Sequence, residues 1–129
     1  MKRDFDLIRD LLFQLENGGR SLESYEAFEL GKRSVEEAGH ALVLMHDRGL
    51  VKALRSPEFT SSEFYTFYDI SMTWEGYDFL DSVRDPEIWK KTKEGALAAG
   101  GFTFDLVKAL AKGFAKTKIQ QHTGIELDL

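Results

Sequence analysis

The sequence predicts a mixed α+β fold with a winged helix-turn-helix-like core, a small antiparallel sheet and two added C-terminal helices. Three features predict it: a capped helix that ends before Gly49, an alternating apolar stretch over residues 64–72, and a helix start at Thr73-Trp74-Glu75-Gly76. Helix, strand and returning wing strand in this order are typical of winged helix-turn-helix domains. We expect the core in residues 1–85 and a helical extension in residues 86–129, packed on the core or forming a dimer contact, as one compact domain.

The composition is that of an ordinary globular protein. Of the 129 residues, 43% are hydrophobic, 30% charged and 12% aromatic, which is sufficient for a dense core. The absence of cysteine excludes disulfides, thiolate zinc sites and thiol nucleophiles. The N-terminus is a charged amphipathic segment rather than a signal sequence, and no apolar run approaches the roughly 18 residues of a membrane span. We therefore expect a cytoplasmic protein that does not contact membranes.

Charge is divided unevenly along the chain. Residues 1–85 hold ten basic and seventeen acidic side chains, whereas residues 86–122 hold seven lysines and three acidic side chains. The net charge of −5 therefore conceals a basic C-terminal segment, which lies outside the predicted helix-turn-helix.

The first expected helix covers residues 4–16. Asp4 is a suitable N-cap, apolar residues recur at helical spacing, and Asn17-Gly18-Gly19 ends the pattern. The segment 20–33 is compatible with a short strand or a short helix, and both alternatives stay open.

The second expected helix covers Val35 to Asp47. Ser34 and Glu37 have the spacing of a capping box, in which each side chain accepts one of the unpaired N–H groups at the helix start. Gly49 supplies the left-handed residue that commonly follows a helix. A strand is expected to begin at Leu50.

The wing is expected to return as a strand over residues 64–72. Phe64, Ile70 and Met72 fall on one face of this alternation, and Tyr65 and Phe67 fall on the other. Thr73 is expected to cap the following helix, with inward-facing residues Tyr77, Leu80 and Val83.

Two further helices are expected after Asp85-Pro86, separated by Gly100-Gly101. The last one combines an apolar stripe with a row of lysines at i,i+4 spacing: Lys108, Lys112 and Lys116. Such a helix commonly packs on its own domain or on a second copy of the chain, so a homodimer is expected.

Several segments resemble an uncharacterised bacterial and phage family that is known only as a domain of unknown function. They are Met1-Lys2-Arg3-Asp4, the segment at 46–51, the segment at 72–85 with its Thr-Trp-Glu-Gly helix start, and Trp89-Lys90-Lys91-Thr92-Lys93-Glu94. The resemblance implies a gene of the kind often found in prophages. It implies no catalytic or binding residues.

The helix Val35–Asp47 would be the recognition helix of a DNA-binding domain, but its outward positions are unfavourable for that role. Carboxylates there are repelled by phosphates, whereas DNA affinity comes mainly from Lys and Arg. We therefore favour a protein contact, with these candidate residues: Glu36, Glu37, His40, Tyr65 and Phe67. The candidates for a nucleic-acid contact are Lys32, Arg33, Lys52, Arg55, Lys108, Lys112 and Lys116.

No motif predicts catalysis or a cofactor. Glu37-x-x-His40 has the spacing of half a di-metal carboxylate site, but no second Glu-x-x-His occurs. The chain also lacks Gly-x-Ser-x-Gly, a phosphate-binding Gly-rich loop and His-Glu-x-x-His. We expect no enzyme, no metal and no cofactor. The favoured function is a prophage-type accessory protein that binds another protein, and the alternative is a DNA-binding transcriptional regulator.

Overall fold

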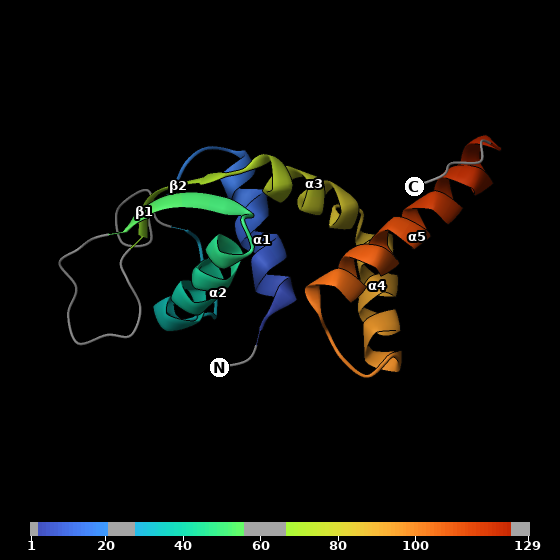
Figure 1. Ribbon diagram of the computed structural model, residues 1–129, viewed down its shortest axis with the longest axis horizontal. Coiled ribbons are helices and arrows are strands. Elements are labelled where there is room, and N and C mark those ends of the chain that lie inside the picture. Colours follow the sequence, from blue (N-terminus) through green and yellow to red (C-terminus); the bar gives the residue numbers. More distant parts are fainter. Residues whose placement is uncertain (1–2, 21–27, 56–66, 125–129) are drawn as a thin grey trace. The chain divides into compact units, whose positions relative to one another are not determined.

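The computed structural model describes residues 3–20, 28–55 and 67–124 (Figure 1). Within these residues the fold is mixed α+β, as predicted. The elements in chain order are α1 (Phe5–Glu16), α2 (Val35–Asp47), β1 (Val51–Arg55), β2 (Phe67–Met72), α3 (Trp74–Val83), α4 (Pro86–Ala98) and α5 (Phe104–Thr123). No helix among the described residues has both the length and the apolar character needed to cross a membrane.

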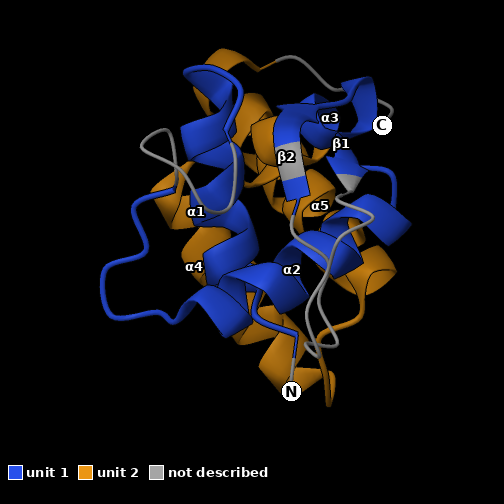
Figure 2. Cartoon of the chain, turned by 90° about the vertical axis from the view of Figure 1, so that its left-hand side faces the viewer, with its two compact units in different colours: residues 1–78 blue, residues 79–129 orange. Residues whose placement is uncertain are grey.

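The chain divides into two compact units, residues 1–78 and residues 79–129 (Figure 2). The division falls inside α3, so residues 74–78 of this helix belong to unit 1 and its remainder to unit 2. Most of the predicted winged-helix segment lies in unit 1, and the predicted C-terminal helices lie in unit 2.

Unit 1 is built from α1, α2 and the β1–β2 hairpin. The helices pack against each other, α1 also contacts β2, and α2 contacts β1 (Figure 1). The predicted helix starts are confirmed: Asp4 accepts a hydrogen bond from the Leu7 amide, and Ser34 and Glu37 form the capping box. The core consists of apolar side chains from both helices and both strands, including Leu11, Leu12, Leu42, Met45, Val51 and Ile70.

A β-bulge in β2 gives Phe67 a different orientation from the predicted one. Lys52 pairs with Ser71 and Leu54 pairs with Tyr68, so one residue of β1 stands opposite two residues of β2. One of these two, Asp69, has a left-handed φ of 51°, which an Asp tolerates better than most residues. The extra residue reverses the in–out alternation. Phe67 is consequently 1% exposed, and the expectation that it lies on the outer face of the wing is wrong.

For the segment 20–33, where a short strand and a short helix were both possible, the structure describes a strand-like pairing at Arg20. Its backbone N–H donates to the Ile70 carbonyl at 3.0 Å, and the Ile70 N–H donates back to Arg20 at 2.7 Å. Arg20 thus forms an isolated antiparallel bridge on the free side of β2. Residues 21–27 lie outside the described residues, and no helix or strand covers residues 28–33.

Unit 2 contains the end of α3 and the helices α4 and α5. Phe79 stacks on Phe104 with ring centroids 4.8 Å apart, and the buried Thr92 hydroxyl donates to the Ile88 carbonyl within α4. Asp85 caps α4, whose first residue is Pro86, so the expected break of the chain at Asp85-Pro86 is confirmed.

Candidate functional site

The start of α3 is fixed to the turn that follows α2. The Thr73 hydroxyl donates to the Gly49 carbonyl and accepts from the Gly76 amide at 3.1 Å. The Thr73 amide also donates to the Leu50 carbonyl at 3.1 Å. One threonine therefore caps α3 and attaches it to the residues just before β1, which limits the positions that the helix start can adopt.

Gly76 allows this close approach. A Cβ atom at position 76 would lie 2.1 Å from the Leu50 carbonyl oxygen and 2.6 Å from the Met72 Cγ. No side chain fits there, so the inward face of the first turn of α3 must carry glycine. In the segment Thr73-Trp74-Glu75-Gly76, the first and last residues thus have structural roles.

The outward face of this turn carries two aromatic residues. Trp74 is 80% exposed and Tyr77 is 43% exposed, so the expectation that Tyr77 faces inward is wrong. The inward positions are occupied by Gly76, Phe79 and Leu80, which places Trp74 on the opposite side of the helix and Tyr77 on its flank. A tryptophan exposed to this degree is unusual, because its large apolar surface is normally covered.

Glu75 and Asp78 are the exposed carboxylates beside these rings. Within the described part of the chain, no ion pair engages either carboxylate. We name Trp74, Glu75, Tyr77 and Asp78 the α3 platform. Trp and Tyr are among the side chains that carry much of the affinity at protein–protein interfaces.

The helical positions of Gly76 and Leu80 indicate which residues of α3 face outward. Gly76 and Leu80 share the buried side of α3, and residues two positions before an inward helical residue point away from the core. An inward glycine therefore implies an outward Trp74. That signal is available only when Gly76 is known to face inward.

The three predicted contact residues of α2 have different environments. Glu36 is exposed, whereas the Glu37 carboxylate is engaged in the capping box and His40 is partly buried. Glu37 also lies 3.9 Å from the Arg33 guanidinium. Of the other two protein-contact candidates, Tyr65 lies outside the described residues, and Phe67 is in the core.

Of the candidate DNA contacts in unit 1, Arg33 is engaged in ion pairs within the chain. Lys32 and Lys52 are exposed, but the Arg33 guanidinium pairs with Asp4 and lies near Glu37. Arg55 lies at the end of β1, opposite Phe67. The positive charge available to a phosphate on this unit is thus reduced by internal ion pairing.

The lysine row predicted in the last helix lies on α5, with Lys112 exposed and Lys108 and Lys116 partly exposed. These residues belong to unit 2. They share one side of α5 by their i,i+4 spacing.

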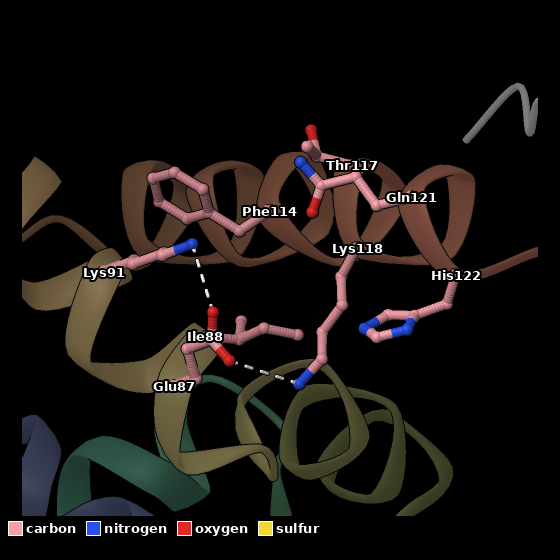
Figure 3. A pocket seen from close by; sticks show the side chains of 8 residues that line it. All are labelled: Glu87, Ile88, Lys91, Phe114, Thr117, Lys118, Gln121 and His122. Carbon is pink, nitrogen blue, oxygen red and sulfur yellow. Dashed lines mark ion pairs between the residues drawn. The ribbon is translucent and has the colours of Figure 1, made fainter.

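A small recess between α4 and α5 is lined by charged, polar and apolar side chains (Figure 3). The Lys118 ammonium lies 2.5 Å from the Asp85 carboxylate and 3.6 Å from Glu87, and Lys91 lies 3.2 Å from Glu87. The recess has a cavity volume of about 60 Å³, which accommodates about two water molecules at roughly 30 Å³ each. Cofactor and substrate pockets are several times larger, so we interpret the recess as an ion-paired junction of two helices.

The hydrogen bond between Lys118 and Asp85 is the main cause of two pKa shifts. It lowers the pKa of Asp85 below its usual 3.8, and it raises the pKa of Lys118 above its usual 10.5. The pKa of Glu87 is lowered as well, mainly by the hydrogen bond from Lys91. The Asp85–Lys118 pair contributes its full stabilisation at pH values between the usual pKa of Asp, 3.8, and the usual pKa of Lys, 10.5. It is lost in acid as pH falls through the pKa of folded Asp85, and in base as pH rises through the pKa of folded Lys118.

Replacing Lys118 by alanine should therefore raise the pKa of Asp85 toward its usual value, while the α4 cap remains. The N-cap bonds use the other carboxylate oxygen of Asp85, which accepts from the Glu87 and Ile88 amides. An NMR titration of the Asp85 carboxyl carbon in both proteins measures the shift. Lys112→Ala is the matched control, since no ion pair with Asp85 involves it; equal titration curves for Lys118→Ala and the native chain would show that the pair does not form.

Among the described residues, no group of three or more His, Asp or Glu side chains is placed to hold a metal ion. The Glu37-x-x-His40 pair accordingly has no further ligands in that part of the chain. The capping and ion-pair contacts of Glu37 give the carboxylate a structural role at the start of α2.

Comparisons with known proteins agree with the resemblance drawn from the sequence. Residues 2–102 match the family model described as Hypothetical protein (DUF2513), a span that contains the α3 platform and ends before α5. An uncharacterized protein of Haemophilus influenzae is 26% identical over 121 residues, covering 94% of this chain and 98% of the relative. No solved structure matches the chain. Because the family model covers most of its length, the chain belongs to the DUF2513 family.

Proposed function

We propose that this chain is a non-enzymatic binding protein, a phage- or prophage-type accessory factor whose winged-helix-like unit 1 contacts another protein. The observation that carries the proposal is the α3 platform, with a Trp74 side chain 80% exposed on a helix start held by Thr73 and Gly76. A rigid, exposed aromatic residue loses little conformational entropy on binding, which favours its use as an anchor. The phage assignment rests on the sequence resemblance.

The order of elements in unit 1 supports a winged-helix-like module. Helix α1 is followed by the bridge residue Arg20, then by α2 and the β1–β2 hairpin. The bridge places Arg20 beside β2, so three backbone segments align as in the small sheet of such domains. In this module α2 takes the place of the recognition helix.

The charge of α2 supports a protein partner over DNA. Its first turn carries Glu36 and Glu37 and its last residue is Asp47, and phosphates disfavour carboxylates at a groove contact. The α3 platform adds two carboxylates and no basic side chain.

A DNA-binding regulator is the second candidate, favoured by one observation. Residues 86–122 hold seven lysines against three acids, and Lys108, Lys112 and Lys116 follow one side of α5. A helix of this kind offers phosphate contacts whose affinity falls steeply with salt.

One paired experiment distinguishes the two functions. The purified full chain is mixed with genomic DNA fragments at about 50 mM and about 200 mM salt, and in parallel is used to capture proteins from an extract of its host. We expect no DNA binding even at the lower salt, together with a captured polypeptide that is lost with Trp74→Ala and kept with Leu97→Ala, another exposed apolar position. Tight DNA binding that weakens steeply with salt, without a Trp74-dependent polypeptide, would support the regulator instead.

A further inference from the structure

We propose that the α3 platform binds a cationic segment of the partner protein, with an arginine side chain stacked on the Trp74 indole and paired with Asp78, and with Glu75 adding to the negative charge of the surface. This inference rests on the proposed function and specifies the chemistry of the partner. It follows from the helical spacing, the charge and the rigidity of the platform.

The spacing of the platform suits one extended side chain. Trp74 and Asp78 are four residues apart on one helix, and Trp74 and Tyr77 are three apart, so each pair lies on neighbouring positions of the helix surface. A guanidinium over the indole is therefore within reach of the Asp78 carboxylate. Arginine is suited to both contacts, because its planar group stacks on aromatic faces and donates two parallel hydrogen bonds to a carboxylate.

Charge complementarity selects a cation as the occupant. The platform contains two carboxylates and no basic residue, and unit 1 as a whole has nine basic and fifteen acidic side chains. Glu75 has a second explanation, since a carboxylate in the first turn favours the helix dipole. Asp78 lies beyond the first turn, where the dipole gives little reason for a carboxylate, so Asp78 is the more specific sign of a cationic partner.

The same features disfavour other occupants. A nucleic acid would place phosphates against Glu75 and Asp78, which costs electrostatic free energy. An uncharged apolar segment would cover the rings but leave both carboxylates partly desolvated, which is also unfavourable. A cationic segment satisfies the rings and the carboxylates together.

The first step of the test uses tryptophan fluorescence of the full chain. The chain has two tryptophans, and Trp89 is only 4% exposed, so Trp89→Phe leaves Trp74 as the sole reporter. We expect solvent-exposed emission that acrylamide, a neutral quencher, quenches readily. Emission typical of a buried indole would show that Trp74 is covered in the free protein and would overturn the proposal.

The second step measures binding of a fluorescein-labelled hexa-arginine peptide by anisotropy, at about 0.15 M ionic strength so that distant charges are screened. We expect saturable binding that Trp74→Ala and the double substitution Glu75→Gln, Asp78→Asn each weaken by roughly tenfold or more. Trp74→Phe keeps a ring for stacking and should retain most of the affinity. A hexa-lysine peptide should bind more weakly, because an ammonium cannot pair in a bidentate manner.

The matched control is the double substitution Asp10→Asn, Glu94→Gln, which removes the same charge from two exposed positions outside the α3 platform, one on α1 and one on α4. It should change the affinity less than twofold. Equal losses from both double variants, or an unchanged affinity of Trp74→Ala, would show attraction to net charge alone and overturn the proposal. If no peptide binds while Trp74-dependent capture of a host protein persists, the cationic chemistry is wrong and the proposed function stands.

Discussion

Gly76→Ala should destabilise unit 1 by about 3 kcal/mol or more, the magnitude expected when a well-packed site is overfilled and cannot relax. The added methyl group would meet the Leu50 carbonyl oxygen at 2.1 Å. This carbonyl accepts from the Thr73 amide, and the Leu50 amide donates to the Met45 carbonyl at 2.8 Å. Both sides of the Leu50 backbone are therefore held, so the clash cannot be relieved by a side-chain rotation.

Urea unfolding followed by circular dichroism measures this loss, with Gly113→Ala as the control. Position 113 is also inside a helix, but a Cβ there meets nothing within 4 Å. Alanine should stabilise α5 by roughly 0.5–1 kcal/mol, because glycine loses more conformational freedom in a helix. A Gly76→Ala protein as stable as the native chain would mean that α3 does not approach Leu50 as described, and the orientation of the α3 platform would be wrong with it.

The helices of unit 1 could be predicted from the sequence because their signals are local. The Asp4 cap, the capping box of Ser34 and Glu37 and the left-handed Gly49 each depend on residues within one turn of the chain. The helix boundaries Val35 and Asp47 were correct for this reason.

The orientation of Phe67 and Tyr77 could not be predicted in the same way. Strict alternation assigns Phe67 to the outer face, but the bulge at Asp69 adds one residue to β2 and turns the ring inward. Tyr77 was expected on the inward face of its helix with Leu80 and Val83, whereas the approach of Gly76 to Leu50 sets the rotation of α3 and leaves Tyr77 exposed.

The ion-paired junction of unit 2 was also beyond sequence reasoning. Asp85 and Lys118 are separated by 33 positions in the chain, and only the packing of α4 against α5 brings them together. The sequence predicted the cap and the proline at Asp85-Pro86, which are local. It did not indicate that the second carboxylate oxygen of Asp85 pairs with Lys118 of α5.

The second large effect concerns position 74 itself. A photo-reactive amino acid with an aromatic ring, such as benzoylphenylalanine, in place of Trp74 keeps a ring at the anchor position, as Trp74→Phe does. It should form a covalent adduct with a partner polypeptide, because the α3 platform lies inside the proposed interface. The same amino acid at Leu97, an apolar residue 67% exposed on α4, should form none with that partner. Centrally placed aromatic anchors contribute most of the binding energy of an interface, while exposed apolar residues outside it contribute little.

The most direct test of a protein-binding α3 platform is therefore photo-crosslinking in living cells of the host, with the full chain carrying the photo-reactive amino acid at position 74 or position 97. The expected result is one discrete adduct at position 74 that is absent at position 97. With the photo-reactive amino acid at position 74, the yield of the adduct should also fall when Glu75→Gln and Asp78→Asn are added. No adduct at position 74, or the same adducts at both positions, would contradict the assignment of this surface as the binding site.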